Sequence, residues 1–219
     1  KYLATVYSYI RDESHRTNGV PWDPCSDDLD VTYDREDYNS FKMNLGNWSA
    51  SSNYYEYWSH YYRGIRSATY FIQHIGSNQE MLDDPTRGPI VVEQYKNEAR
   101  FLRAWFYHYL WMAYGGVPII TEVLDNNVST DIFYPRETAQ KTFEFIDKEL
   151  DEIKDDLPPR RSGSDLGRAS KGAILTLKGW VELFHASELR NPGKDKKRWE
   201  AAAATSVSYT HLRAHETCA

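Results

Sequence analysis

A long apolar helix, expected between Pro89 and Tyr114, constrains this chain more than any other feature. Its apolar residues recur at helical spacing and form two adjacent stripes. The first stripe contains Tyr95, Ala99, Leu102, Phe106, Tyr109 and Ala113, and the second contains Phe101, Trp105, His108 and Met112. A helix that is apolar around most of its circumference belongs inside a protein rather than on its surface. We therefore expect this segment to be the buried, central helix of the fold.

Glycine and proline mark both ends of this helix. Pro89, after Gly88, suits the first helical position, where the N–H group that proline lacks would be unpaired anyway. Gly115-Gly116 provides a left-handed C-terminal cap, and Val117-Pro118 then forces an extended backbone. The helix is therefore expected to end within a residue or two of Tyr114.

The sequence within and just after this helix resembles the signature of the SusD/RagB family. The resemblance is carried by Glu98-Ala99-Arg100-Phe101-Leu102-Arg103-Ala104, by the aromatic run that follows, and by Tyr114-Gly115-Gly116-Val117-Pro118. Ile65-Arg66-Ser67-Ala68 and the block that opens at Gly167-Arg168-Ala169-Ser170 are also similar to the family. Its members are surface lipoproteins of Bacteroidetes that capture nutrients, usually glycans, for an outer-membrane transporter. Within this resemblance the long helix is scaffold, and its aromatic residues are core.

Helical spacing recurs along most of the chain and predicts an all-α fold. We expect helices over residues 1–10, 54–75, 89–114 and 136–157, another from about residue 172, and a partner helix that starts near Trp199. The last two resemble a tetratricopeptide-type pair, in which small residues such as Gly172 and Gly179 allow close packing. The resemblance implies a SusD-like helical fold with tetratricopeptide-type helix pairs and long irregular loops.

Residues 1–205 are interpreted as the N-terminal part of one SusD-like domain that is truncated at both ends. The chain opens at Lys1 without a start methionine, a signal peptide or a lipid-bearing cysteine, so it is expected to be a fragment. Residues 206–219 differ in character from the rest and resemble translated vector sequence. We expect this tail to be non-native.

Composition argues against some functions and favours another. The net charge is -6 and no basic cluster is present, which argues against nucleic-acid binding. No apolar run approaches the ~20 residues of a membrane-spanning helix. The family resemblance implies that the membrane is reached only through a lipid anchor that the fragment lacks. Aromatic residues make up 15% of the chain, with 17 Tyr and 7 Trp. Tyr and Trp rings stack on sugar faces while their OH or NH groups stay in water.

Motifs for catalysis and metal binding are missing from the sequence. The chain lacks the G-x-S-x-G, S-x-x-K, H-E-x-x-H and C-x-x-C patterns and a phosphate-binding glycine loop. Cys25 and Cys218 do not have metal-ligand spacing. The acidic run from Asp27 to Asp37 does not fit an EF-hand loop, so a solvated acidic loop is preferred over a calcium site. We therefore expect no enzyme activity, no cofactor and no metal.

The stretch from Arg11 to Ser52 has no regular period, and long loops of this kind are more often functional than idle. The candidate ligand site is the loop from Trp22 to Asn53. A sugar site needs an exposed aromatic ring beside amide and carboxylate partners. The loop and its C-terminal end supply Trp48, Asn53, Tyr54, Asp28 and Arg35. In SusD-like proteins the corresponding loop contributes an aromatic residue and polar residues to the glycan site, so the resemblance favours this assignment. The alternative is that Trp48 folds back onto the 54–75 helix as a buried anchor.

Together these features predict a cell-surface protein that binds a glycan, an oligo- or polysaccharide, without catalysis. The resemblance implies delivery of that glycan to a SusC-like, TonB-dependent transporter, and attachment of the intact protein to the outer membrane through a lipid anchor. Two alternatives stay open. One is a tetratricopeptide-type scaffold that binds peptide, and the other is a glycoside hydrolase, whose two carboxylates can be far apart in sequence.

Overall fold

The computed structural model consists of helices and irregular segments, and it describes residues 1–11, 23–29, 39–49, 51–52, 57–124 and 133–217. The main helices are α1 (Tyr2–Tyr7), α3 (Trp58–His74), α5 (Gly88–Tyr114), α6 (Ala139–Ile153), α7 (Lys171–Ala186) and α8 (Lys196–Thr217). Shorter elements are α2 (Asn39–Asn44), α4 (Gln79–Leu82) and 3-10 turns at Asp23–Cys25, Ile75–Ser77 and Gly163–Asp165. No β-strand forms in these residues, apart from one isolated bridge, and the predicted all-α fold is confirmed.

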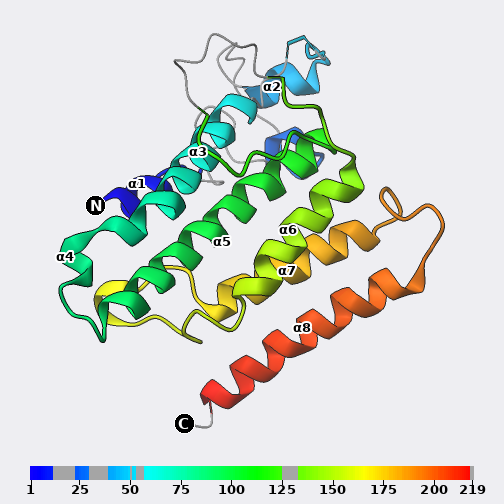
Figure 1. Ribbon diagram of the computed structural model, residues 1–219. Coiled ribbons are helices and arrows are strands. Elements are labelled where there is room, and N and C mark those ends of the chain that lie inside the picture. Colours follow the sequence, from blue (N-terminus) through cyan, green and yellow to red (C-terminus); the bar gives the residue numbers. More distant parts are fainter. Residues whose placement is uncertain (12–22, 30–38, 50, 53–56, 125–132, 218–219) are drawn as a thin grey trace.

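The long helices form an antiparallel array in which each helix packs beside the next one along the chain (Figure 1). α5 lies between α3 and α6, α6 contacts α7, and α7 contacts α8. This up-and-down order is the one expected of tetratricopeptide-type pairs. The start of α3 and the end of α5 meet at one end of the array, where the Tyr57 N–H donates to the Tyr114 hydroxyl at 3.3 Å. α2 lies at the same end (Figure 1).

The central helix α5 begins at Gly88 and ends at Tyr114, as the glycine and proline signals predict. Gly115 follows with a φ of 75° and a ψ of -118°. The positive φ that the glycine signal predicts is present, but this ψ lies outside the left-handed helical region, so the expected left-handed cap does not form. α5 contacts α3 through Phe106, α6 through Tyr107 and α7 through Trp111. All three of these side chains are fully buried, so the helix is enclosed on several sides.

Glu98, which interrupts the apolar surface of α5, is fully buried and ion-paired. Its carboxylate accepts from Arg161 at 2.8 Å and from Arg168 at 2.5 Å. The Tyr7 hydroxyl also donates to it at 2.8 Å and accepts the backbone N–H of Ala169 at 2.8 Å. Burial raises the pKa of Tyr7, so this hydroxyl stays a donor. One signature residue thus connects α1, α5 and the segment before α7.

Arg100 and Arg103, the other charged signature residues, attach α5 to α6. Arg103 is buried, and its guanidinium lies 2.6 Å from the Glu149 carboxylate. Arg100 lies 3.0 Å from the other oxygen of the same carboxylate. Because one carboxylate receives two planar guanidinium groups, the contact fixes the relative position of the two helices.

The connection between α3 and α5 contains a short helix, α4, that the sequence pattern does not predict. Gly76-Ser77-Asn78 ends α3 through the Ile75–Ser77 turn, as expected. Asn78 then also begins a helix, because its side chain accepts the N–H of Met81 and so caps α4. Asparagine is favoured both after a helix and at the N-cap of the next one, and the sequence pattern identified only the first role.

α8 continues without a break to Thr217, through the tail that is expected to be non-native. Gly179 of α7 lies against Thr205 and Ser206, and Gly172 lies against Tyr209. The small residues of α7 therefore allow the close packing that their spacing predicts. The foreign origin of residues 206–219 stays a prediction.

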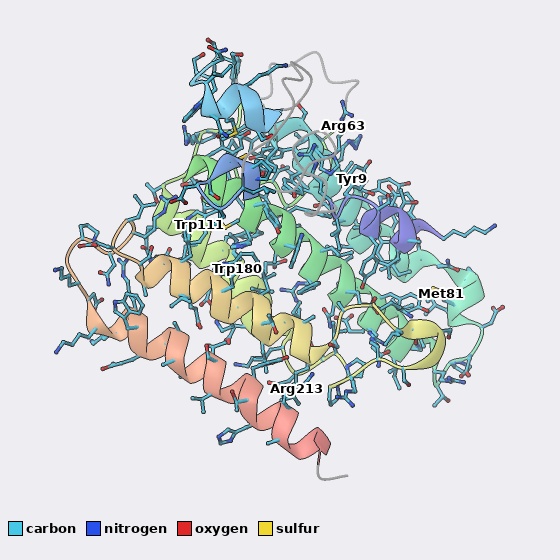
Figure 2. The ribbon with its side chains drawn as sticks, turned by 180° about the vertical axis from the view of Figure 1, so that it is seen from behind. Tyr9, Arg63, Met81, Trp111, Trp180 and Arg213 are labelled. Atoms are coloured by element: carbon cyan, nitrogen blue, oxygen red, sulfur yellow. The ribbon has the colours of Figure 1, made fainter. Side chains whose placement is uncertain are left out.

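The buried imidazole of His108 predicts a loss of stability in acid. Burial lowers the pKa of His108 to about 4. The ring is fully buried beside Tyr109, Trp111 and Trp180, and its nitrogens have no hydrogen-bond partner in the described part of the chain. Figure 2 labels Trp111 on α5 and Trp180 on α7. In the unfolded chain the same imidazole binds a proton near pH 6.5. Between pH about 6.5 and about 4 the unfolded state binds more protons, so the free energy of unfolding should fall as the pH falls through this window.

Urea unfolding at several pH values between neutral and about 4.5 measures this dependence. His108→Phe should reduce the pH dependence, because the variant cannot be protonated at this position. Burial is also the main cause that lowers the pKa of His185 to about 4, so a part of the pH dependence should remain. His74→Gln, at an exposed position of α3, is the control. An unchanged pH dependence in His108→Phe would contradict the assignment.

Candidate functional site

Trp48 lies on an exposed turn directly after α2. This helix ends in a Schellman motif, in which the Asn47 N–H donates to the Lys42 carbonyl and the Gly46 N–H to the Met43 carbonyl, both at 2.9 Å. Gly46 has the left-handed φ of 71° that the motif requires. The Trp48 side chain is 59% exposed. It is therefore available at the surface, rather than buried on α3 as the alternative interpretation requires.

Serine residues form a tight turn immediately after Trp48. The backbone N–H groups of Ser49 and Ser52 each donate to the other residue's carbonyl, at 3.0 and 3.1 Å. The hydroxyls of Ser49 and Ser51 are 3.1 Å apart. Hydroxyl groups both donate and accept, so the turn places polar groups suited to a sugar rim next to the indole in sequence.

The acidic part of the loop is tied to α2. The Asn44 side-chain amide donates to the Pro24 carbonyl at 2.7 Å, which joins the Asp23–Cys25 turn to the helix. Asp28 follows this turn, is exposed, and has its N–H bonded to the Ser26 hydroxyl at 3.2 Å. The structure thus links the segment that carries Asp28 to the helix that leads to Trp48.

Two of the five predicted site residues, Asp28 and Trp48, are described by the structure, and both are exposed. Arg35, Asn53 and Tyr54 lie outside the described residues. The grouping of these five side chains in one site therefore stays a prediction. In the described part of the chain, no cluster of three or more His, Cys, Asp or Glu side chains is arranged to hold a metal ion.

A second exposed tryptophan, Trp58, lies at the start of α3. In the helix expected over residues 54–75, helical spacing places Trp58 on the same face as Ile65 and Ala68 and so predicts that it is buried. Its side chain is 38% exposed, and this expectation is wrong. Helical side chains lean toward the N-terminus, so the ring of a first residue projects beyond its own helix. The ring lies 4.9 Å from that of Tyr62 and 5.3 Å from that of Tyr114. Its position at the helix N-terminus was the signal that could have identified it.

The fold and the site together define an all-α scaffold of tetratricopeptide-like helix pairs that carries the exposed ring of Trp48 after α2. The chain belongs to the SusD-like family: residues 2–179 match the family described as "Starch-binding associating with outer membrane". Among curated protein sequences, none matches this chain. In the described residues no helix is both long enough and apolar enough to cross a membrane.

Solved structures of similar proteins agree with this assignment. The chain is similar to a SusD-like protein from Bacteroides fragilis NCTC 9343, with 26% identity and a TM-score of 0.72 over 96% of this chain and 37% of that chain. A SusD homolog from Bacteroides thetaiotaomicron VPI-5482 has 26% identity and a TM-score of 0.64 over 79% of this chain and 32% of that one. A laminarin-binding SusD-like protein has 25% identity and a TM-score of 0.54, with 68% and 28% covered. The chain therefore spans 28% to 37% of the length of these three proteins.

Proposed function

We propose that this chain is part of a cell-surface protein that binds a glycan and delivers it to a SusC-like, TonB-dependent transporter in the outer membrane. In this proposal residues 1–205 form the N-terminal part of the SusD-like domain, and a lipid anchor outside the chain attaches the protein to the membrane. The family description names starch, and a similar structure is that of a laminarin-binding protein. These names support a glucose-based glycan as the first ligand to test.

The exposed ring of Trp48 is the observation that carries the proposal. A sugar has an apolar CH face and a rim of hydroxyls, so it is held by a flat ring beside hydrogen-bonding groups. Trp48 is 59% exposed and is followed by the Ser49–Ser52 turn, while Asn44 ties the segment of Asp28 to the preceding helix. In the proposed site the ring stacks on one sugar face, and the carboxylate and hydroxyl groups bind its rim.

Binding without catalysis is the form of the proposal that the carboxylates support. A glycosidase needs two carboxyl groups on either side of the scissile bond, one of them protonated. The buried carboxylates of Glu98 and Glu149 are each paired with guanidinium groups, at 2.8 Å from Arg161 and 2.6 Å from Arg103. Both carboxylates are buried and bound to guanidinium groups, so neither is free to contact a sugar.

Trp48→Ala is expected to weaken glycan retention roughly tenfold in the intact protein. Aromatic stacking at a partly exposed site is worth ~1–2 kcal/mol, and ~1.4 kcal/mol corresponds to a factor of ten. The melting temperature should change by less than about two degrees, because substitution of an exposed side chain has little effect on stability. Affinity electrophoresis in gels that contain laminarin or starch measures the retention.

Trp199→Ala is the matched control, because Trp199 is also about half exposed, at 48%, but lies on α8. It should leave retention unchanged. If Trp48→Ala retains full binding and its melting temperature falls instead, Trp48 is a structural anchor and the glycan site lies elsewhere.

Delivery to a transporter is tested separately. An affinity-tagged intact protein, purified from detergent-solubilised outer membranes, is expected to recover a TonB-dependent transporter. Recovery should be unaffected by Trp48→Ala, since that residue is assigned to the glycan. Purification without any transporter would contradict this part of the proposal and leave glycan binding intact.

A further inference from the structure

A pocket of about 230 Å³ lies between α3 and the extended segment 117–124. Its apolar wall consists of Tyr62, Ile65, Ile120 and Leu124, and its polar groups are Arg66, Thr69 and Glu122. No lining residue belongs to the proposed glycan site. The pocket is therefore a separate feature that glycan binding at Trp48 does not explain.

Two tyrosines, the half-buried Tyr62 and the fully buried Tyr107, hold the segment 117–124 against the helices and so fix the shape of the pocket. The Tyr62 hydroxyl donates to the Pro118 carbonyl at 2.7 Å. The Tyr107 hydroxyl accepts the Ile120 N–H at 2.7 Å and lies 3.2 Å from the Ile120 carbonyl. Burial raises the pKa of Tyr107 to about 12, so this hydroxyl stays protonated at neutral pH. Because the pocket is already formed, a ligand loses little free energy in ordering it.

The pocket carries one positive and one negative group that are not joined to each other. Arg66 comes from α3 and Glu122 from the facing segment, and within the described residues no ion pair connects them. The Tyr134 hydroxyl donates to Oε1 of Glu122 at 2.6 Å, which positions the carboxylate. Opposite charges on the two walls match a ligand that carries both charges.

Thr69 adds a buried polar group without a partner. Its side chain is 1% exposed, and its hydroxyl makes no hydrogen bond in the part of the chain that the structure describes. A buried hydroxyl without a hydrogen-bond partner destabilises the fold. A ligand group that bonds to this hydroxyl would recover part of that free energy.

We propose that this pocket binds a zwitterionic α-amino acid with a large apolar side chain, such as leucine or phenylalanine. The side chain occupies the apolar wall, the carboxylate faces Arg66 and the ammonium group faces Glu122. A neutral sugar would instead place its hydroxyls against Ile65, Ile120 and Leu124, and it would leave both charges unmatched. An uncharged hydrocarbon would leave the same two charges unmatched.

Titration of the whole chain with L-leucine and L-phenylalanine, followed by NMR chemical shifts, tests the proposal. A ligand of about ten non-hydrogen atoms in a partly open pocket should have a Kd of about a millimolar. Leucinamide and N-acetyl-leucine each lack one of the two charges, and each should bind roughly threefold more weakly. Glucose should not bind at this pocket.

Three variants locate the binding site. Arg66→Gln and Glu122→Gln should each weaken leucine binding roughly threefold. Thr69→Val should also weaken it without lowering the melting temperature, because the hydroxyl that it removes has no partner in the described residues. Arg63→Gln, at an exposed α3 residue outside the pocket (Figure 2), is the control and should bind leucine normally.

Three results would each overturn the proposal. The first is the absence of saturable binding up to about 50 mM leucine or phenylalanine. The second is equal binding by the wild type and all three pocket variants. The third is N-acetyl-leucine binding as tightly as leucine, because the ammonium group would then have no role and a simple carboxylate would be the ligand.

Discussion

Glu98→Ala is expected to lower the free energy of unfolding by about 3–5 kcal/mol, because removal of one partner leaves buried charges unpaired. The side chains of Arg161 and Arg168 are 9% and 22% exposed, and both donate to this carboxylate. The Tyr7 hydroxyl loses its acceptor as well. For a domain of this size the loss corresponds to a fall in melting temperature of roughly 6–20 °C.

Urea unfolding at pH 7, followed by circular dichroism, measures the change. The matched control is Glu93→Gln on the same helix, where the partner Lys96 is 3.6 Å away and both side chains are exposed. An exposed pair of this kind contributes at most about 1 kcal/mol. If Glu98→Ala costs no more than Glu93→Gln, the buried network is not what holds α1 and the segment before α7 on α5.

Glu98 also shows where inference from the sequence stopped. The helical pattern identified it as an interruption of an apolar helix, but it could not identify its partners. Arg161 and Arg168 lie 63 and 70 residues away, in a connection without a regular period. Their approach depends on the path of that connection after α6, and no local pattern encodes such a path.

The features that were predicted correctly depend on signals within one helical turn. Gly115 ends α5 with a positive φ, and the end of the helix at Tyr114 follows from that local conformation. α4 was missed because Asn78 acts on both sides, ending one helix and capping the next. Local signals thus gave both ends of α5, whereas α6 ends at Ile153 rather than at the predicted residue 157, and α1 ends at Tyr7 rather than at residue 10.

The candidate site could be predicted only in part, for a related reason. Composition and the loop pattern identify Trp48 as a possible surface ring, but its exposure depends on whether another element covers it. The link from Asn44 to Pro24 spans 20 residues and could not be inferred from spacing. Trp58 is exposed although its spacing within the helix predicts burial. It is the first residue of α3, so its ring extends beyond the helix that would cover it.

Gly116→Ala is the second substitution with a large expected effect. A β-carbon at this position would lie 1.8 Å from the carbonyl oxygen of Glu137 and 2.8 Å from the carbonyl carbon of Thr138. Both atoms belong to the backbone, so no side-chain rotation relieves the contact. The Arg136 guanidinium donates to the carbonyls of Tyr114 and Gly116, which opposes a shift of this segment. We expect a loss of about 3 kcal/mol or more in the free energy of unfolding.

Gly115→Ala separates the two physical reasons for the glycine pair. Gly115 has a positive φ but no backbone close to its missing β-carbon, since the nearest atom belongs to the Arg190 guanidinium at 3.5 Å. Its substitution should cost about 1–3 kcal/mol of backbone strain, because a φ of 75° with a ψ of -118° is a conformation that residues with a side chain rarely adopt. Gly76→Ala, with no atom within 4 Å and no positive φ, should have little effect and is the control. Thermal unfolding of the three variants gives the order directly. If Gly115→Ala loses as much free energy of unfolding as Gly116→Ala, the close approach of Gly116 to Glu137 is not the main reason for the glycine pair. The positive φ of Gly115 then determines the need for glycine.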